Sequence, residues 1–512
     1  EERFKEAWRV LLSRHDILRA HFAWQAGLEQ PVQVINKNVK LNWRNLDWSE
    51  VDDTEVPHSG QPSAFSEKLR ELLKHERYQG LPLDQAPLVY CTLIQGPNGR
   101  REFFYTHHHI LLDGWSAQLL SKELWQLYRE GPHALDQDEA PPTYRSYIQW
   151  ILSQDIPRAQ AYWKTYLKDL MAPTPLPAAN PIARTHAESA SDSHAEAVHF
   201  LTSAQMQAVS ECARQQQVTM YAIIQAAWGY LLHAYSREST VVFGSTVSGR
   251  NSSKEHLRLQ EMIGLLINSL PVRVNIDPHQ SVSNLHQQLK TDQLESTQIE
   301  WTPLTHIQSI TNLEKGSGLF QSLLVFENFP YDPNRPATLV REEIVEKTNL
   351  PLTVLMEVTH DKSMQIKSMY STSHYSDSEM KRLLSQFALT IMKVCEVASL
   401  RLPVAAIDIL TDMERSTIVG AWNNTKHSFD TDGLIHEQFD EMASNHPDSI
   451  ALVVGDDQLT YRELNARSNQ LAALLKTQFH VQVDSRVAVC LERSTELMVA
   501  LVAILKAGAT YV

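Results

Sequence analysis

Apolar positions at the start of the chain follow first a helical and then an extended spacing. Four large apolar side chains recur at i, i+4, i+7 and i+8, with Arg and Glu residues opposite, as in an amphipathic helix packed on a core. They are Phe4, Trp8, Leu11 and Leu12. Short apolar segments follow, and Asn98-Gly99 between two of them is a hairpin signal. The pattern predicts extended segments at 31–35, 87–94 and 103–112.

Proline-rich and polar stretches divide the rest of the chain. A proline-rich stretch that is polar to about residue 195 begins with Pro173, Pro175, Pro177 and Pro181. A sequence of this composition forms neither a helix nor a central strand. Helical patterns follow at 203–216, 219–235, 282–298 and 377–398, and strand-like patterns at 241–246, 270–274, 319–327 and 352–360. We predict a first lobe at 1–172, a lobe linker at 173–195, a second lobe at 196–408, an interdomain linker at 409–432 and a further α/β segment at 433–512.

Composition narrows the classes of protein that the chain can represent. The net charge of −14 argues against a nucleic-acid-binding surface as the main function. Four cysteines show no paired spacing, which indicates scattered thiols in a reducing, cytoplasmic setting. The chain contains no run of 18 apolar residues, so we predict no membrane span. We expect both ends to be cut from a longer protein, because the chain lacks an initiator methionine and stops in mid-pattern.

Three consecutive histidines form the most informative segment. Residues 103–110 have the aromatic, β-branched and His composition of a strand, in which His107 and His109 share one face and His108 points to the other. Asp113 and Gly114 then make a turn, and a helix is predicted from Trp115 to Glu130.

This strand–turn–helix segment is compatible with acyl-transfer chemistry. An imidazole on a rigid element can share a proton near pH 7, Gly114 lets its backbone N–H approach a ligand, and a helix N-terminus favours a developing oxyanion. Two other readings are open on the pattern alone. The histidines can be structural, or His107 and His109 can bind a metal with Asp113 as a third ligand.

Residues 108–116 (HHILLDGWS) resemble the HHxxxDG signature of nonribosomal peptide synthetase condensation domains, a signature also found in chloramphenicol acetyltransferase relatives. Five further segments resemble motifs of the condensation family. They are 14–22 (RHExLRxxF, with Asp16 for Glu), 144–150 (YxDYxxW, with Ser146 for Asp), 243–250 (FGxTVSGR), 263–273 (IGxFxNTLPVR, with Ser269 for Thr) and 321–330 (a late FENYP segment).

The last part of the chain resembles a second family. Residues 459–464 (LTYREL) and 505–512 (LKAGATYV) are similar to the first two motifs of adenylation (AMP-binding) domains. The phosphate-binding Ser/Thr/Gly loop of that family is not among the 512 residues. We therefore expect this segment to activate no amino acid, and we expect the rest of an adenylation domain to be its structural partner.

The resemblance implies a mixed α/β (α+β) fold, with two chloramphenicol-acetyltransferase-like lobes in a V and an incomplete adenylation segment. It implies that upstream donor and downstream acceptor peptidyl carrier proteins bring thioesters on 4′-phosphopantetheine arms, with no cofactor or metal bound directly by this chain. The amine of the acceptor attacks the donor thioester and forms an amide.

The resemblance also implies the roles of individual residues. His109 lies beside the amine, as a base or as a positioning group, and Gly114 offers its N–H near the oxyanion. Asp113 holds the loop by pairing with a buried Arg, for which Arg273 is the expected partner. The others, His108, Trp115 and Ser116, are supporting residues.

Three alternatives stay open at this stage. An epimerisation domain shares the His pair, although the DGWS ending and the adenylation-like text downstream argue against it. A catalytically inactive domain could still dock carriers, and a metal hydrolase would need bound metal. The residues Ile110, Leu111 and Leu112 resemble those of domains that take an L-configured donor. They do not identify the donor, the acceptor or the product.

Overall fold

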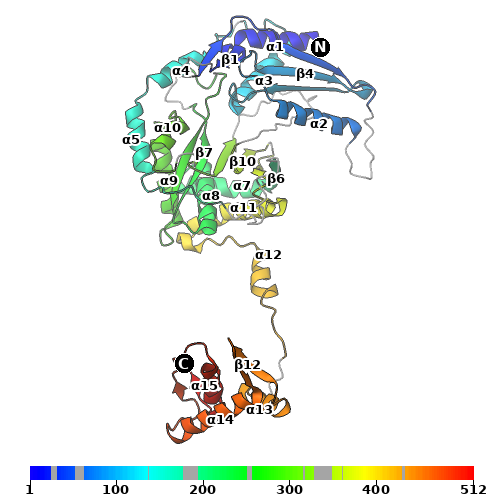
Figure 1. Cartoon of the computed structure of the whole chain (residues 1–512). Helices are drawn as coiled ribbons and strands as arrows, with labels where there is room; N and C mark the ends of the chain where they lie inside the picture. Colours follow the sequence, from blue (N-terminus) through cyan, green and yellow to red (C-terminus); the bar gives the residue numbers. More distant parts are fainter. Residues whose placement is uncertain are drawn as a thin grey trace. The chain divides into compact units, whose positions relative to one another are not determined.

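The computed structural model describes residues 1–24, 31–51, 63–136, 138–176, 194–250, 257–314, 318–327, 349–359, 361–428 and 433–512. Contacts divide the chain into two compact units, Glu1–Met413 and Glu414–Val512 (Figure 1). Most of the predicted lobe linker, at 177–193, and the last residues of the late motif, at 328–330, lie outside the described residues. In the part of the chain that is described, no helix is long and apolar enough to cross a membrane.

A three-stranded sheet forms the centre of the first lobe in the described residues of unit 1. Strand β3 (Asn42–Asp47) runs parallel to β4 (Val89–Gln95), and β4 pairs antiparallel with β5 (Arg101–His107). A 3₁₀ turn at Pro97–Gly99 joins β4 to β5. Asn98 and Gly99 have φ angles of 54° and 78°, a left-handed conformation that Asn and Gly adopt most readily. The predicted hairpin is therefore confirmed.

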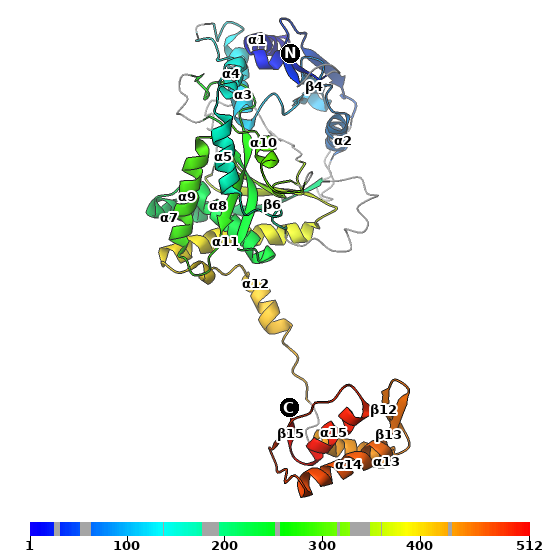
Figure 2. The ribbon, with the colours of Figure 1, turned by 60° about the vertical axis from the view of Figure 1, so that its left-hand side comes forward.

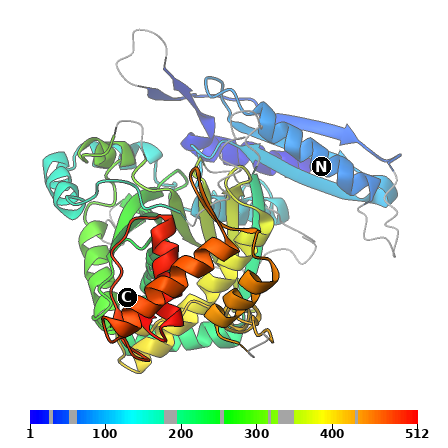
Figure 3. The same cartoon turned by 60° about the horizontal axis from the view of Figure 1, so that its bottom comes forward.

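Helices cover both faces of this sheet, because successive side chains of a strand point to opposite faces and apolar side chains lie on each. On one face, α1 (Glu2–Arg14) and α3 (Gly114–Glu130) bury their apolar stripes, and Trp8 and Leu120 join a cluster with Val89. On the other face lies α2 (Ala64–Gln79) (Figures 1 and 3). Its Phe65 packs against Ile94. The opening helix predicted from the apolar spacing is confirmed, whereas α2 was not predicted.

The second lobe contains a larger sheet within the residues described for unit 1. Its strand order is β6-β11-β10-β9-β7-β8, with β9 parallel to both neighbours and the other pairs antiparallel. The strands are β6 (His194–Leu201), β7 (Thr240–Val247), β8 (Asn268–Asn275), β9 (Ser322–Glu327), β10 (Leu352–Val358) and β11 (Met364–Ser371). The strand-like patterns predicted β7 to β10, and they missed β6 and β11.

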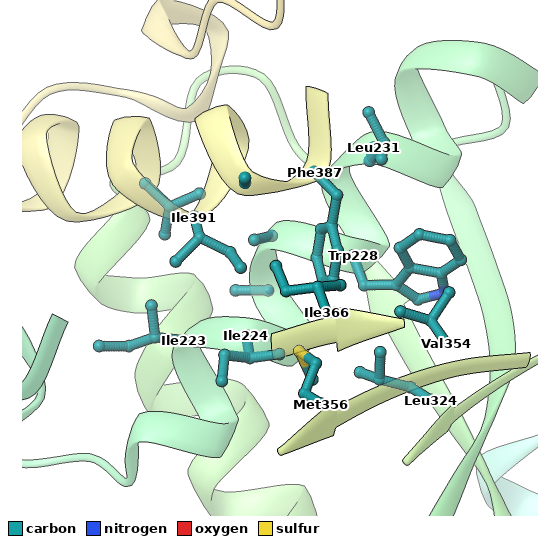
Figure 4. Close-up of a cluster of buried hydrophobic side chains, with 14 of the residues drawn as sticks. Ile223, Ile224, Trp228, Leu231, Leu324, Val354, Met356, Ile366, Phe387 and Ile391 are labelled. Carbon is teal, nitrogen blue, oxygen red and sulfur yellow. The ribbon is translucent and has the colours of Figure 1, made fainter. Parts of the chain in front are cut away.

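Four helices pack beside this sheet (Figure 2). They are α7 (Ser203–Gln216), α8 (Met220–Ser236), α9 (Val282–Thr297) and α11 (Asp377–Ser399). All four were predicted from apolar spacing. Trp228 of α8 meets Phe387 of α11 edge to face, with ring centroids 5.0 Å apart, above strand residues that include Ile366 (Figure 4). This cluster is the main hydrophobic core of unit 1, and its large aromatic side chains stabilise the second lobe by burial.

Two aromatic-rich helices lie at the end of the predicted first lobe (1–172). They are α4 (Tyr144–Leu152) and α5 (Ile156–Tyr166). Helix α5 buries Trp163 in a cluster with Leu270 of β8, Trp301 and Phe320. Helix α5 thus packs on residues of the second lobe, and the predicted lobe bounds stay a prediction.

Unit 2 is a small α/β assembly. Helices α13 (Ile435–Asn445), α14 (Tyr461–Thr477) and α15 (Thr495–Lys506) accompany the short strand pairs β12 (Ile450–Val454) with β13 (Asp457–Thr460) and β14 (Arg486–Val487) with β15 (Thr510–Tyr511). The ammonium group of Lys506 donates hydrogen bonds to Asp440, Asn465 and Asn469, and the side chain is 6% exposed. A buried ammonium needs such partners, so this network ties α13, α14 and α15 together.

Candidate functional site

The candidate site is the turn between β5 and α3. Strand β5 ends at His107, which pairs with Val89 at the start of β4. The next residues along that partner strand are Leu88 and Pro87, and proline has no N–H to continue a ladder. The prediction of a strand to residue 110, with His107 and His109 on one face, is therefore wrong: His109 lies in the turn.

The three histidines have different surroundings. His107 stacks on Tyr105 with ring centroids 5.5 Å apart, and burial, with His109 and His108 nearby, lowers the pKa of His107 to about 4. His108 is half-buried, its Nδ1 accepts a hydrogen bond of 3.1 Å from the Ile110 N–H, and burial lowers its pKa. His109 is exposed. Of the three imidazoles, that of His109 is the one open to a solvent-borne substrate.

Buried residues hold the turn in place. Leu111 and Leu112, which follow the histidines, are 0% and 1% exposed and belong to the core of the first lobe. Asp113 is the N-cap of α3, and its Oδ1 accepts a 2.8 Å hydrogen bond from the Ser116 N–H, as helix N-caps do. Gly114 is the first residue of α3, and the first amides of a helix have no intrahelical acceptor and carry the positive end of its dipole.

Asp113 pairs with Arg250, and the prediction of Arg273 as its partner is wrong. Nη2 of Arg250 lies 2.9 Å from Oδ1 and 3.1 Å from Oδ2 of Asp113, and the two side chains are 2% and 0% exposed. Oδ2 also accepts from the Leu266 N–H at 2.9 Å. Burial lowers the pKa of the Arg250 guanidinium, and the Asp113 carboxylate opposes that shift. The pair joins a residue of the first lobe to a residue of the second.

Arg273 is occupied elsewhere for a structural reason. It lies on β8, where its Nη1 donates to the backbone oxygen of Tyr166 at 3.0 Å and its Nη2 lies 3.3 Å from Oδ2 of Asp169. These contacts direct the guanidinium to the end of α5. Arg250 follows Gly249, whose φ of 66° turns the chain after β7. Arg250 ends the matched FGSTVSGR segment, which was the available sequence signal for its role.

A segment of the second lobe passes over the start of α3. We call residues 257–266 the strap. Arg250 Nη1 donates to the backbone oxygens of Leu259 at 2.5 Å and Met262 at 2.8 Å, and Trp115 Nε1 donates to the Gln260 oxygen at 3.0 Å. The strap thus supplies acceptors both to Arg250 and to the first turn of α3, while the supporting role of Trp115 stays a prediction.

The hypothesis of a metal site at His107 and His109 lacks its third ligand, Asp113, in this geometry. Both carboxylate oxygens of Asp113 are engaged by Arg250 and by backbone amides inside the protein, so the group is not free to coordinate an ion beside His107 and His109. Over the described residues, no three His, Cys, Asp or Glu side chains are grouped to hold a metal ion. The turn instead presents an exposed imidazole next to a helix N-terminus, an arrangement suited to proton and oxyanion contacts.

The fold and this turn define a class: two-lobed α/β domains with a HHxxxDG turn braced by a buried Asp–Arg pair. The family model of the condensation domain matches residues 1–419, and that of the AMP-binding enzyme matches residues 439–512. The chain belongs to the condensation domain family, and a partial AMP-binding match follows.

Relatives place this domain among nonribosomal peptide synthetases. The chain is 33% identical over 517 residues to a linear gramicidin synthase protein of Brevibacillus parabrevis, a match that covers 99% of this chain and 6% of that protein. It is 31% identical over 522 residues to bacitracin synthase 3 of Bacillus licheniformis, a match that covers 100% of this chain and 8% of that protein. The chain therefore spans a small part of the length of the curated relatives that it matches.

Two solved structures share the fold. One is a four-domain nonribosomal peptide synthetase bound to AMP and glycine, with a TM-score of 0.70 and 20% identity over 100% of this chain and 38% of that chain. The other is the first condensation domain of the calcium-dependent antibiotic synthetase with a substrate analogue, with a TM-score of 0.59 and 17% identity over 80% of this chain and 91% of that chain. The mixed α/β fold class predicted from the sequence is confirmed.

Proposed function

We propose that unit 1 forms an amide bond between a donor acyl or peptidyl thioester and an acceptor aminoacyl thioester, both carried on phosphopantetheine arms of peptidyl carrier proteins. The observation that carries the proposal is the exposed His109 on a turn that is held rigid by the buried Asp113–Arg250 pair. Membership of the condensation family implies an amide-forming acyltransferase. Upstream donor and downstream acceptor carriers are the proposed partners.

The reaction moves one proton and exchanges one bond. The acceptor amine attacks the donor carbonyl, the C–N bond forms, and the C–S bond breaks as the tetrahedral intermediate collapses. The proton lost by the amine ends on the departing thiol. Because an α-amino group titrates near pH 8, a modest interaction is enough to keep the acceptor amine in its neutral, nucleophilic form. We therefore assign His109 to orient the amine and accept its hydrogen bond.

The start of α3 supplies the second contact of the proposed mechanism. The N–H of Gly114 lies at the positive end of the helix, where it can donate to the oxyanion of the intermediate. Glycine at this position leaves the amide uncovered by a Cβ. The buried side chains of Asp113, Arg250 and Ser116 do not reach substrate in this proposal, and they hold the turn instead.

The test supplies the chain with two synthetically loaded carriers and measures the amide product by mass spectrometry. His109→Ala should abolish the product, whereas His279→Ala, which removes another exposed histidine of unit 1, should leave the rate unchanged. Product formation by His109→Ala at the rate of the unmodified chain would overturn the assignment.

The same assay separates the alternative functions. A donor residue that loses an α-deuterium label without amide formation would indicate an epimerisation domain. Binding of both carriers with neither product nor label loss would indicate an inactive docking domain. Each of these outcomes would contradict the proposed condensation activity.

A further inference from the structure

One hydroxyl group connects the strap to the first turn of α3. Ser116 is fully buried. Its Oγ donates to the Gly264 backbone oxygen at 2.7 Å and accepts from the Gly264 N–H at 3.0 Å and from Arg250 Nη2 at 2.8 Å. The hydroxyl thus uses its donor and both acceptor positions. Its loss would leave buried backbone groups of the strap without partners.

The strap is held from a second direction by Tyr144 at the start of α4. The Tyr144 hydroxyl donates to the Leu265 backbone oxygen at 2.8 Å. A Cβ placed on Gly264 would lie 2.3 Å from Cδ2 of the Tyr144 ring, so the strap passes between the tyrosine ring and Ser116 where only glycine fits. The position of Gly264 is therefore set from both sides.

The position of Ser116 bears directly on the proposed mechanism. Ser116 follows Gly114 by two residues in the same helical turn, and Asp113 accepts the Ser116 amide. A movement of Ser116 relative to the strap would move the Gly114 amide and the turn that carries His109. We propose that Ser116 is a positioning residue, whose hydroxyl uses the strap to fix the Gly114 amide and the His109 turn. Its effect on rate rests on the proposed condensation activity.

The kinetic test compares Ser116→Ala with Ser368→Ala in the assay with loaded carriers. Ser368 is a matched control, because it is also fully buried in unit 1 and donates to the Ala197 oxygen, far along the chain from the turn. Ser116→Ala should lower the single-turnover rate constant by about 10- to 100-fold, the loss expected when reacting groups are misplaced, with an unchanged KM for either carrier. Ser116→Cys, which keeps a weak donor and acceptor, should recover part of the rate. Equal rates for Ser116→Ala and the unmodified chain would overturn the proposal.

A second readout does not depend on activity. In chain labelled at histidine ¹³Cε1, the His109 ring signal is the one absent from His109→Ala. This signal should shift in Ser116→Ala and, in the same direction, in Tyr144→Phe, which removes only the bond to Leu265. It should not shift in Ser368→Ala.

The two readouts separate failure of this proposal from failure of the proposed function. If the unmodified chain forms no amide, a shifted His109 signal still supports the positioning role and the condensation activity alone fails. If Ser116→Ala leaves the His109 signal unmoved, the positioning role is wrong whatever the rate does.

Discussion

Replacing Arg250 by Met should lower the free energy of unfolding of unit 1 by about 3–5 kcal/mol, the cost of removing one partner of a buried ion pair. Taken as whole residues, Arg250 is 3% exposed and Asp113 is 1% exposed. After the substitution, the carboxylate stays buried with the amides of Ser116 and Leu266 as its partners. Two strap oxygens, on Leu259 and Met262, would also lose their donor.

The assay is urea denaturation at pH 7 followed by tryptophan fluorescence. Arg273→Met is the control, because Arg273 pairs with the exposed Asp169, and the two side chains are 18% and 59% exposed. Such solvent-screened pairs contribute about 0–1 kcal/mol, and the lost hydrogen bond to the Tyr166 oxygen adds about 1 kcal/mol, so this variant should stay within about 2 kcal/mol of the unmodified chain. The two arginines should therefore differ by at least about 1 kcal/mol.

A double-mutant cycle with Asp113→Ala tests the pairing itself. Since each single variant strands one charge, the double variant should cost less than the sum of the two. Additive costs within about 0.5 kcal/mol would show that the two groups do not stabilise each other. A loss in Arg273→Met as large as that in Arg250→Met would show that burial does not decide the strength of these pairs.

The remaining predictions concern single positions. His109→Ala should keep the urea midpoint of the unmodified chain, because the ring is exposed, whereas His108→Ala should lower the midpoint through loss of the acceptor for a turn amide. Burial lowers the pKa of His286 from 6.5 to about 4, so the unfolded chain binds the proton at a higher pH than the folded chain does. The free energy of unfolding should therefore fall as the pH is lowered from 6.5 to 4, by at most about 1.4 kcal/mol per pH unit for this group. His286→Leu should reduce the slope of unfolding free energy against pH, and an unchanged slope would contradict this. Gly249→Ala should cost more than about 1 kcal/mol in urea denaturation, because φ is 66° and the new Cβ would lie 2.1 Å from the Leu266 oxygen; a midpoint equal to that of the unmodified chain would refute this strain.

Local patterns predicted most of the elements around the site. The stripe that includes Trp8, the Asn98-Gly99 turn and the Asp-Gly start of α3 each carry their structural signal within a few residues. Such signals depend on helix and strand periodicity and on turn conformations, which are determined locally. The same holds for the long helices of the second lobe, whose apolar faces repeat over many residues.

Features that depend on distant partners could not be predicted. Three histidines after aromatic residues suit a strand, yet β5 stops at His107 because Pro87 stands opposite the position of His109. The matched motifs also could not decide between Arg250 and Arg273 as the partner of Asp113, because each arginine lies in a matched motif of the second lobe. The route of the strap decides that choice, and tertiary contacts alone determine this route.

The buried Asp–Arg junction bears on how synthetase genes can recombine. Asp113 and Ser116 precede the predicted lobe linker at 173–195, while Arg250 and the strap follow it. A crossover inside that linker therefore joins a carboxylate from one parent to a counter-charge from another. Such a chimaera keeps a satisfied interior only where both parents place the Asp, Ser, Arg and Gly in register, because an orphaned buried charge is costly. Compatibility of exchanged halves thus depends on these junction residues together with the apolar contacts that α5 makes with the second lobe.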